Sequence, residues 1–162
     1  MRTHTVVSIV ASLVALTASA GLAQSQGNPA LHHLSEFKAS TFTMSSQGEP
    51  ALAVAPDGSF AVVWSSRRQQ EGRYGVYMQR FDSRGVAVGL ETPLNLWTAS
   101  HVLSPVIDIA RDGSAWTAWQ SAGQDGHAGA IIARHFDATG VGGAEILAND
   151  RTEGEQAGPI VA

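Results

Sequence analysis

The amino-acid sequence predicts an all-β fold built from repeated four-stranded antiparallel meanders. Apolar residues alternate with a period of two in short runs, and turns containing glycine separate these runs. The stretch APDGSFAVVW at 55–64 returns as ARDGSAWTAW at 110–119. Beyond the first two dozen residues, no window has a helical period. These observations indicate short strands arranged in a repeat.

The N-terminus carries the pattern of a secretory signal peptide, which we place at residues 1–23. Arg2 precedes the apolar stretch Val6–Leu16, and small residues offer cleavage after Ala20 or after Ala23. The apolar stretch is short for a membrane anchor. We therefore expect a secreted or periplasmic protein that is not inserted in a membrane after cleavage. Residues 24–33 are expected to form a flexible leader.

Composition narrows the classes of function. Apolar residues make up 44% and charged residues 15% of the 162 residues, which is typical of a folded chain. A net charge of −4 argues against binding to nucleic acid or to an anionic membrane. The absence of cysteine excludes disulfides and thiolate chemistry. The histidines lack zinc-ligand spacing, so we expect neither a metal nor another cofactor.

An internal repeat organises the chain from residue 34 onward. Residue i matches residue i+55 from Pro50 to Val86, and the offset is 54 from there on. The matched positions include Asp57-Gly58-Ser59 with Asp112-Gly113-Ser114, Trp64 with Trp119, Phe81-Asp82 with Phe136-Asp137, Glu91 with Glu145, and Asn95 with Asn149.

Each repeat unit is predicted to contain four strands, and their bounds are given for the first copy. The predicted strands are Pro50–Ala55, Ser59–Ser65, about Tyr74–Phe81 and Val86–Leu94. An Asp-Gly turn joins the first two and Asp82–Gly85 joins the last two, because glycine accepts a positive φ without steric cost. Both faces of these strands are largely apolar, so each sheet needs cover on two sides. Such mutually covering four-stranded sheets are typical of β-propeller blades.

The predicted divisions are a preceding fourth strand and loop at 34–49, one blade at 50–104, a second at 105–158, and the start of a third at 159–162. Propeller closure takes ~4–8 blades, whereas this sequence holds about two and a half. Two hypotheses follow: the sequence is a piece of a longer propeller, or a short chain closes by oligomerising. Self-association through open sheet edges belongs to the second hypothesis.

The pattern P-x-(apolar)-A-x-D-G-S-x-x-x-x-W … R-x-F-D-x-x-G resembles the repeats of large exported bacterial β-propeller proteins. More loosely, Asp57-x-Ser59…Trp64 is similar to the Asp-box turn of sialidase-type propellers. The resemblance covers about residues 34–162 and implies a propeller fold. Ala55 and Ala110 stand where that box has serine, and no catalytic residue of sialidases is matched.

Candidate ligand-binding residues lie mostly in the less repeated loops, predicted at Ser65–Arg73, Trp97–Ser104 and Ser121–Ala128, which share one end of a four-stranded meander. The arginines could clamp a carboxylate or phosphate, or simply be solvated. Trp97 could stack on a sugar ring or pack between blades, and Asp108 could face a central channel. The candidates are Arg67, Arg68, Arg73, Trp97, His101, Asp108, Asp125 and His127.

The repeated residues invite a second interpretation. Asp57 and Asp112 could act as metal or catalytic carboxylates, but we expect them to hydrogen-bond their own turns. Gly58 and Gly113 would then shape those turns, and we expect Trp64 and Trp119 to be core residues. We therefore expect no catalytic residue and a non-catalytic module that binds or scaffolds a protein or glycan. The alternative is a fragment of a sialidase-like or other glycan-active propeller enzyme.

Overall fold

The computed structural model describes residues 36–162. The predicted signal peptide at 1–23, the leader at 24–33 and the first residues of the 34–49 segment lie outside this range. Within it the chain forms strands and turns, which confirms the all-β prediction. None of the described residues belongs to a helix long and apolar enough to cross a membrane.

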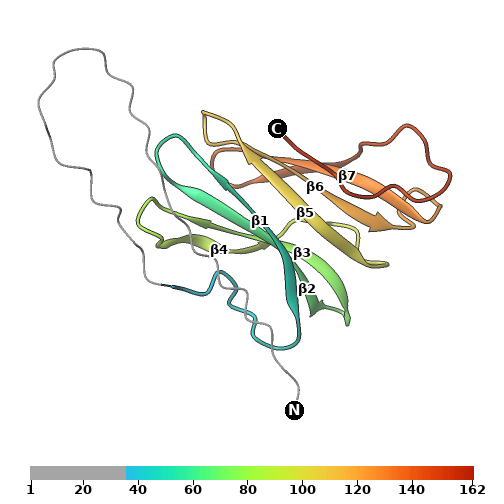
Figure 1. The fold of residues 1–162 in the computed structure, drawn as a ribbon, viewed down its shortest axis with the longest axis horizontal. Helices are drawn as coiled ribbons and strands as arrows, with labels where there is room; N and C mark the ends of the chain where they lie inside the picture. Colours follow the sequence, from blue (N-terminus) through green and yellow to red (C-terminus); the bar gives the residue numbers. More distant parts are fainter. Residues whose placement is uncertain (1–35) are drawn as a thin grey trace, which may run out of the picture.

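Two four-stranded antiparallel sheets follow each other along the chain (Figure 1). The first sheet has the order β1-β2-β3-β4 and the second the order β5-β6-β7-β8, so every neighbour in a sheet is also a neighbour in sequence. The strands are β1 Gln47–Val54, β2 Phe60–Gln70, β3 Arg73–Phe81, β4 Ala87–Pro93, β5 Val102–Ile109, β6 Ala115–Ala122, β7 Gly129–Phe136 and β8 Gly142–Leu147. The two sheets are not closed into a ring.

The structure corrects some predicted strand bounds. β2 and β3 extend until only Glu71-Gly72 separate them, so Arg67 and Arg68 lie in a strand rather than in the predicted loop. The hairpin lengthens because Arg67 still pairs with Tyr74 and Gln70 with Arg73 across a bulge. At both ends of the described range the expected strand pairing is not seen. Residues 159–162 are not in a strand, and the described part of the 34–49 segment before β1 contributes only a bridge at Lys38.

The tight turns repeat in detail. The Asp57 carboxylate accepts hydrogen bonds from the backbone N–H of Ser59 at 2.9 Å and from its hydroxyl at 2.6 Å. Asp112 does the same with Ser114, at 2.9 and 2.7 Å. Gly58 and Gly113 follow these aspartates with φ of 83° and 84°, the left-handed conformation that glycine adopts most readily. Both carboxylates therefore hold turn backbone in this structure.

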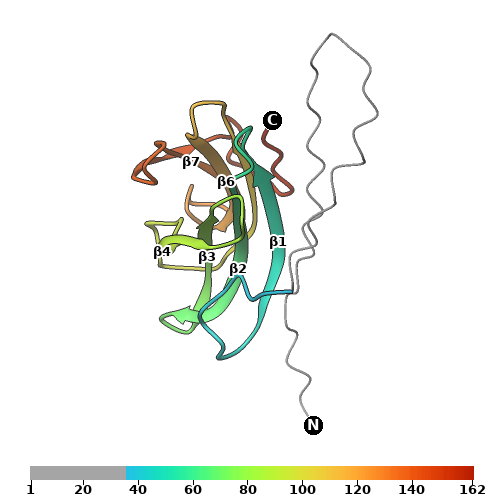
Figure 2. The same ribbon diagram turned by 90° about the vertical axis from the view of Figure 1, so that its left-hand side faces the viewer.

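The main core lies between the two sheets, where β5 packs against β1, β2 and β3 (Figure 1). Figure 2 shows β1, β2 and β3 of the first sheet beside β6 and β7 of the second. Trp119 is fully buried there, beside Leu94 from the segment that leaves β4. The first sheet contributes small and medium side chains such as Val63 and Met78 to the same cluster. Burial of this shared face holds one sheet against the other.

A second cluster covers the opposite face of the first sheet. The rings of Phe60 and Phe81 stack with centroids 4.9 Å apart, and Trp64 is buried beside them. Phe37 and Ala39, which precede β1, pack over this cluster. Trp64 and Trp119 are repeat equivalents, so each sheet buries its tryptophan on the corresponding face.

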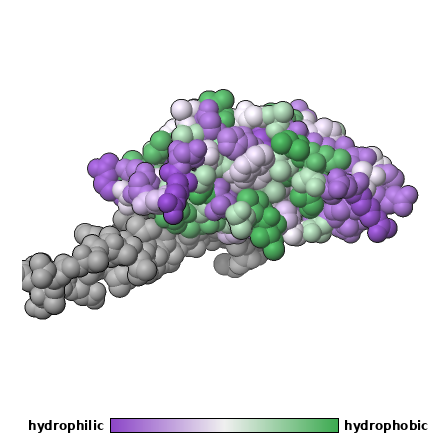
Figure 3. Space-filling view, turned by 90° about the horizontal axis from the view of Figure 1, so that it is seen from above, coloured by the Kyte–Doolittle hydropathy of each residue, from purple (hydrophilic) through white to green (hydrophobic). Residues whose placement is uncertain are grey.

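Apolar side chains remain on the outside, and hydrophobic residues show as green areas among purple hydrophilic ones in Figure 3. Trp116 is 43% exposed on the face of the second sheet that points away from the first. Its repeat equivalent is Ala61, which is buried between the sheets. Corresponding positions thus have opposite exposure, because the second sheet covers the first and nothing described covers the second.

Replacing Trp119 with alanine should destabilise the protein strongly. The side chain is fully buried between the sheets, so truncation leaves a large cavity and costs about 3–5 kcal/mol. Trp116→Ala is the matched control, since its side chain is 43% exposed and far less contact is lost. Chemical denaturation of both variants measures the difference; equal losses would contradict the assignment of Trp119 to the inter-sheet core.

The turn carboxylates should make stability fall in acid. Hydrogen bonds from the hydroxyl and then the backbone N–H of the following serine lower the pKa of Asp57 and of Asp112 below 3.8. A lowered folded-state pKa stabilises the fold above the unfolded-state value, and this contribution is lost as the pH falls below about 3.8. The double variant Asp57→Asn, Asp112→Asn should lose less stability than the wild type between about pH 4 and pH 2. Parallel acid limbs in thermal melts would refute this prediction.

Candidate functional site

Three connections that vary between the repeats meet at one end of the sheets. They join β2 to β3, β4 to β5, and β6 to β7. Arg73 Nη1, at the start of β3 directly after the first connection, donates to the backbone oxygen of Thr98 in the second, at 3.4 Å. Gln124 in the third bonds to Glu145, which in turn accepts from the backbone of the second. The three predicted loop regions therefore do lie together.

A glutamate–glutamine pair, which we call the latch, fastens one sheet to the segment before it. Glu145 accepts hydrogen bonds from the backbone N–H of Leu96 at 2.5 Å and of Trp97 at 3.3 Å, while Gln124 Nε2 donates to its other oxygen at 2.8 Å. The latch occurs twice. In the first sheet, Glu91 accepts from the backbone N–H of Thr41 at 2.9 Å and from Gln69 Nε2.

The latch positions are related by the repeat. Thr41 precedes Leu96 by 55 residues, Gln69 precedes Gln124 by 55, and Glu91 precedes Glu145 by 54. The segment before β1 therefore contacts the first sheet as the segment after β4 contacts the second. This contact fixes the connection between β4 and β5 against the second sheet.

A second inter-sheet contact lies where β1 and β5 begin. The Glu49 carboxylate accepts hydrogen bonds from the Ser65 hydroxyl at 2.7 Å and from the backbone N–H of Ser104 at 2.9 Å. Glu49 and Ser104 both occupy bulges with positive φ, 51° and 53°. The bulge aims Ser104 N–H at the carboxylate rather than at a strand partner.

Two asparagines hold the chain as it leaves each sheet. Asn95 Oδ1 accepts from Val76 N–H at 3.0 Å, and its Nδ2 donates to the backbone oxygen of Trp97 at 2.8 Å. Asn149 makes the same two bonds, to Ile131 N–H and to the oxygen of Arg151, each at 2.8 Å. Asn95 is buried, so the geometry of this exit is fixed inside the fold.

The Arg134 side chain extends from β7 to Leu94, the residue that directly follows β4 of the first sheet. Its Nη1 donates to the Leu94 oxygen at 2.7 Å and its Nε to the Gly143 oxygen at 2.7 Å. Burial lowers the pKa of Arg134, and the Glu145 carboxylate opposes that shift. Its hydrogen bonds therefore tie the two sheets together.

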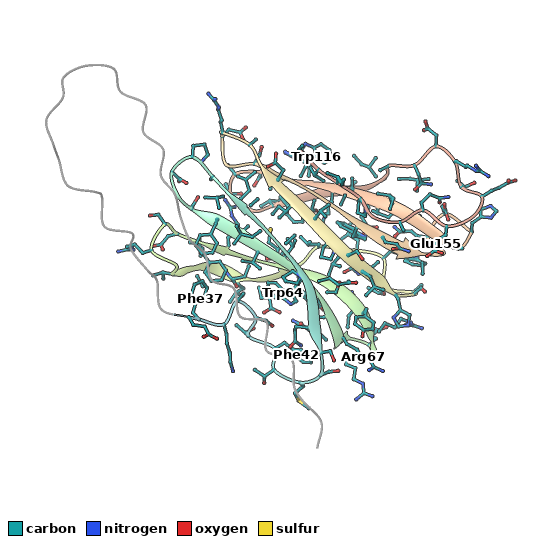
Figure 4. All side chains as sticks on the ribbon, in the orientation of Figure 1. Phe37, Phe42, Trp64, Arg67, Trp116 and Glu155 are labelled. Atoms are coloured by element: carbon teal, nitrogen blue, oxygen red, sulfur yellow. The ribbon has the colours of Figure 1, made fainter. Side chains whose placement is uncertain are left out.

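Beside this frame, the β2–β3 hairpin and the β4–β5 connection carry a group of cationic and aromatic residues, which we call the basic cluster: Arg67, Arg68, Arg73, Tyr74 and His101. Side-chain contacts join three of them, Arg67, Tyr74 and His101. Arg67 Cζ lies 5.9 Å from the Tyr74 ring centroid, and the Tyr74 and His101 rings meet edge to face at 5.7 Å. Tyr74 N–H donates to His101 Nδ1 at 3.2 Å. Figure 4 shows Arg67 pointing away from the ribbon near the end of the first sheet.

The arginines of the basic cluster are not neutralised by described neighbours. Arg67 and Arg68 are exposed and Arg73 is partly buried. Among residues 36–162 the one ion pair within 4.0 Å joins Arg84 and Asp82, at the other end of the sheet. The exposed guanidinium groups of Arg67 and Arg68 are therefore available to an anion, whereas Arg73 already donates to Thr98.

The remaining predicted site residues lie apart from the cluster or serve the frame. Trp97 is half-buried, and its backbone N–H donates a hydrogen bond to Glu145. Asp125 accepts from the His127 N–H at 3.1 Å and from Asn149 Nδ2 at 3.4 Å, so it supports the β6–β7 loop, on which His127 is exposed. Asp108 pairs across the strands with Trp116, on the outward face of the second sheet.

No three histidine or acidic side chains come together as a potential metal site anywhere in residues 36–162. Two features are not predicted from the sequence. The strand pattern predicts only that Tyr74 begins a strand, although its repeat equivalent is Gly129, which marks Tyr74 as unrepeated. The repeat matches Glu91 with Glu145 but predicts no role for them, because each pairs with a segment over 40 residues away and such pairing leaves no local signal.

Comparison with known proteins adds no assignment. No family model matches the chain, and no curated protein matches it.

Removing the latch carboxylate should weaken the contact between the sheets. Glu145→Ala leaves the N–H groups of Leu96 and Trp97 without their acceptor, and hydrogen bonds to a charged group are worth about 1.5–3 kcal/mol. Glu145→Gln keeps an acceptor oxygen and should lose less. Urea unfolding measures both, and an alanine variant as stable as the glutamine variant would show that the latch contributes little.

Proposed function

We propose that this protein is an exported, non-catalytic module of propeller-type blades that binds a protein or a glycan. The observation that carries the proposal is the contrast between the two ends of the sheets. One end has the repeated aspartate turns. At the other end, loops from both sheets differ in sequence and are braced by latch and asparagine contacts. Rigid scaffolds that present variable loops are the usual setting of binding sites.

The sheet arrangement supports the propeller-type assignment. Successive four-stranded meanders pack face to face, and the same tryptophan, latch and asparagine contacts recur with the sequence repeat. The Phe37 segment meets the first sheet as the segment after β4 meets the second. Such serial packing is how a propeller adds blades.

The loop end is tested by comparing matched pairs of alanine variants. The full chain is screened on glycan and peptide arrays, and bound ligands are titrated by calorimetry. Arg68→Ala with His127→Ala changes two exposed residues at the loop end, and Arg84→Ala with Arg111→Ala changes two at the turn end. We expect the first pair to weaken binding about tenfold or more and the second to leave it unchanged.

The same preparation is assayed for hydrolysis of sialosides and polysaccharides. Absence of turnover beside measurable binding is the expected result. Turnover that survives purification to homogeneity would replace this proposal with the glycan-active enzyme. Equal effects of the two variant pairs would remove the loop end as the binding surface.

A further inference from the structure

We propose that the basic cluster binds the carboxylates of an acidic polysaccharide, a polyuronate. This inference rests on the proposed binding function and adds the location of the site and the chemistry of the ligand.

The repeat provides an internal control for what the fold requires. The second sheet folds in the same way with Ala122, Gly123 and Ala128 in place of the three arginines, Gly129 in place of Tyr74, and Glu155 in place of His101. Residues that build the fold, such as Trp64, Asn95 and Glu91, are the same in both copies. The basic cluster is therefore unnecessary for the architecture.

The backbone conformation also indicates that the fold does not require these charged residues. Arg68 has a φ of 66°, a left-handed conformation that side chains disfavour, and its equivalent Gly123 has 74°. Glu71 at 43° likewise stands where the second sheet has Gly126 at 90°. The first hairpin keeps charged residues at positions where glycine would be unstrained. Glu49 and Ser104 also have positive φ, but they are equivalent bulge positions that keep a side chain in both sheets, whereas Arg68 has a glycine as its equivalent.

The donors fit a carboxylate. The guanidinium of Arg67 lies over the Tyr74 ring, which restricts its orientation and prepares its planar fork for two parallel hydrogen bonds. Because His101 Nδ1 accepts from the Tyr74 N–H, the ring proton of neutral His101 resides on Nε2. His101 can therefore donate to a ligand oxygen. The turn between β2 and β3 also carries one carboxylate, that of Glu71, whose side chain is exposed to solvent.

The hydrogen bonding of the backbone favours a glycan over an acidic peptide. Peptides that add to a sheet use free strand backbone. Here the N–H of Arg67 donates to the Ser46 oxygen and that of Tyr74 to His101. The cluster thus offers side-chain donors on an exposed surface, which suits ligands that carry carboxylates and hydroxyls on every unit. Several arginines on one hairpin also suit a polymer with repeated charge.

The decisive experiment titrates the full chain with an oligogalacturonate, with its neutral methyl ester, and with poly-glutamate. We expect binding of the oligogalacturonate, weakened by added salt because the pairing is exposed, and no binding of the ester. The variant Arg67→Ala, Arg68→Gly, Arg73→Ala installs the second sheet's own residues. It should weaken binding at least about tenfold.

Arg68→Gly alone separates binding from folding. Glycine removes a side chain from a left-handed position, so the thermal midpoint should rise while affinity falls. A fall in both would assign Arg68 a structural role. The matched control Arg84→Ala, Arg111→Ala should bind as the wild type does.

Failure of the carboxylate site and failure of the proposed binding function give different results. Equal binding of acid and ester, or undiminished binding by the triple variant, would overturn the carboxylate site while leaving the proposed binding function standing. Binding of poly-glutamate without oligogalacturonate would replace the glycan by an acidic protein. If the ligands found on the arrays also bind the loop-end variants as tightly as the wild type, the proposed binding surface is wrong as well.

Discussion

The fold depends on each sheet burying an apolar face against a neighbour. A four-stranded sheet with two apolar faces is unstable alone in water, because its surface has no polar side to present. β5 meets this need for the first sheet by lying against β1, β2 and β3, and Trp119 fills the space between them. On the other face, Phe37 and Ala39 cover Trp64 and its neighbours. Packing between repeats is thus the main source of order.

Hydrophobic burial has little directionality, and polar contacts determine how the sheets are aligned. Glu145 accepts two backbone N–H groups of the connection between β4 and β5, and Glu49 accepts the N–H of Ser104 near the start of β5. Arg134 adds a bond to Leu94. These contacts join charged groups to backbone, which makes them specific in position as well as favourable.

The repeat separates the residues that both sheets need from those that occur in one sheet only. Aspartate turns, buried tryptophans, latch residues and asparagines recur and hold the fold in both sheets. The basic cluster occurs once, and it includes an arginine in a backbone conformation for which the second sheet uses glycine. This contrast between the two sheets is the basis of the proposed carboxylate site.

The sequence by itself determined the repeat, the four strands of each unit and the tight turns, because these depend on local alternation and on glycine at fixed positions. It also singled out Arg67, Arg68, Arg73 and His101 as candidate binding residues, together with four residues that lie elsewhere. Only the tertiary structure decided that β2 carries Arg67 and Arg68, that Tyr74 joins them, and that Asp108 and Asp125 lie elsewhere. Strand length, the sheet-to-sheet latch and the meeting of loops from different hairpins arise from pairing between distant segments. Such pairing depends on which surfaces come into contact in the folded chain, so a local sequence pattern does not predict it.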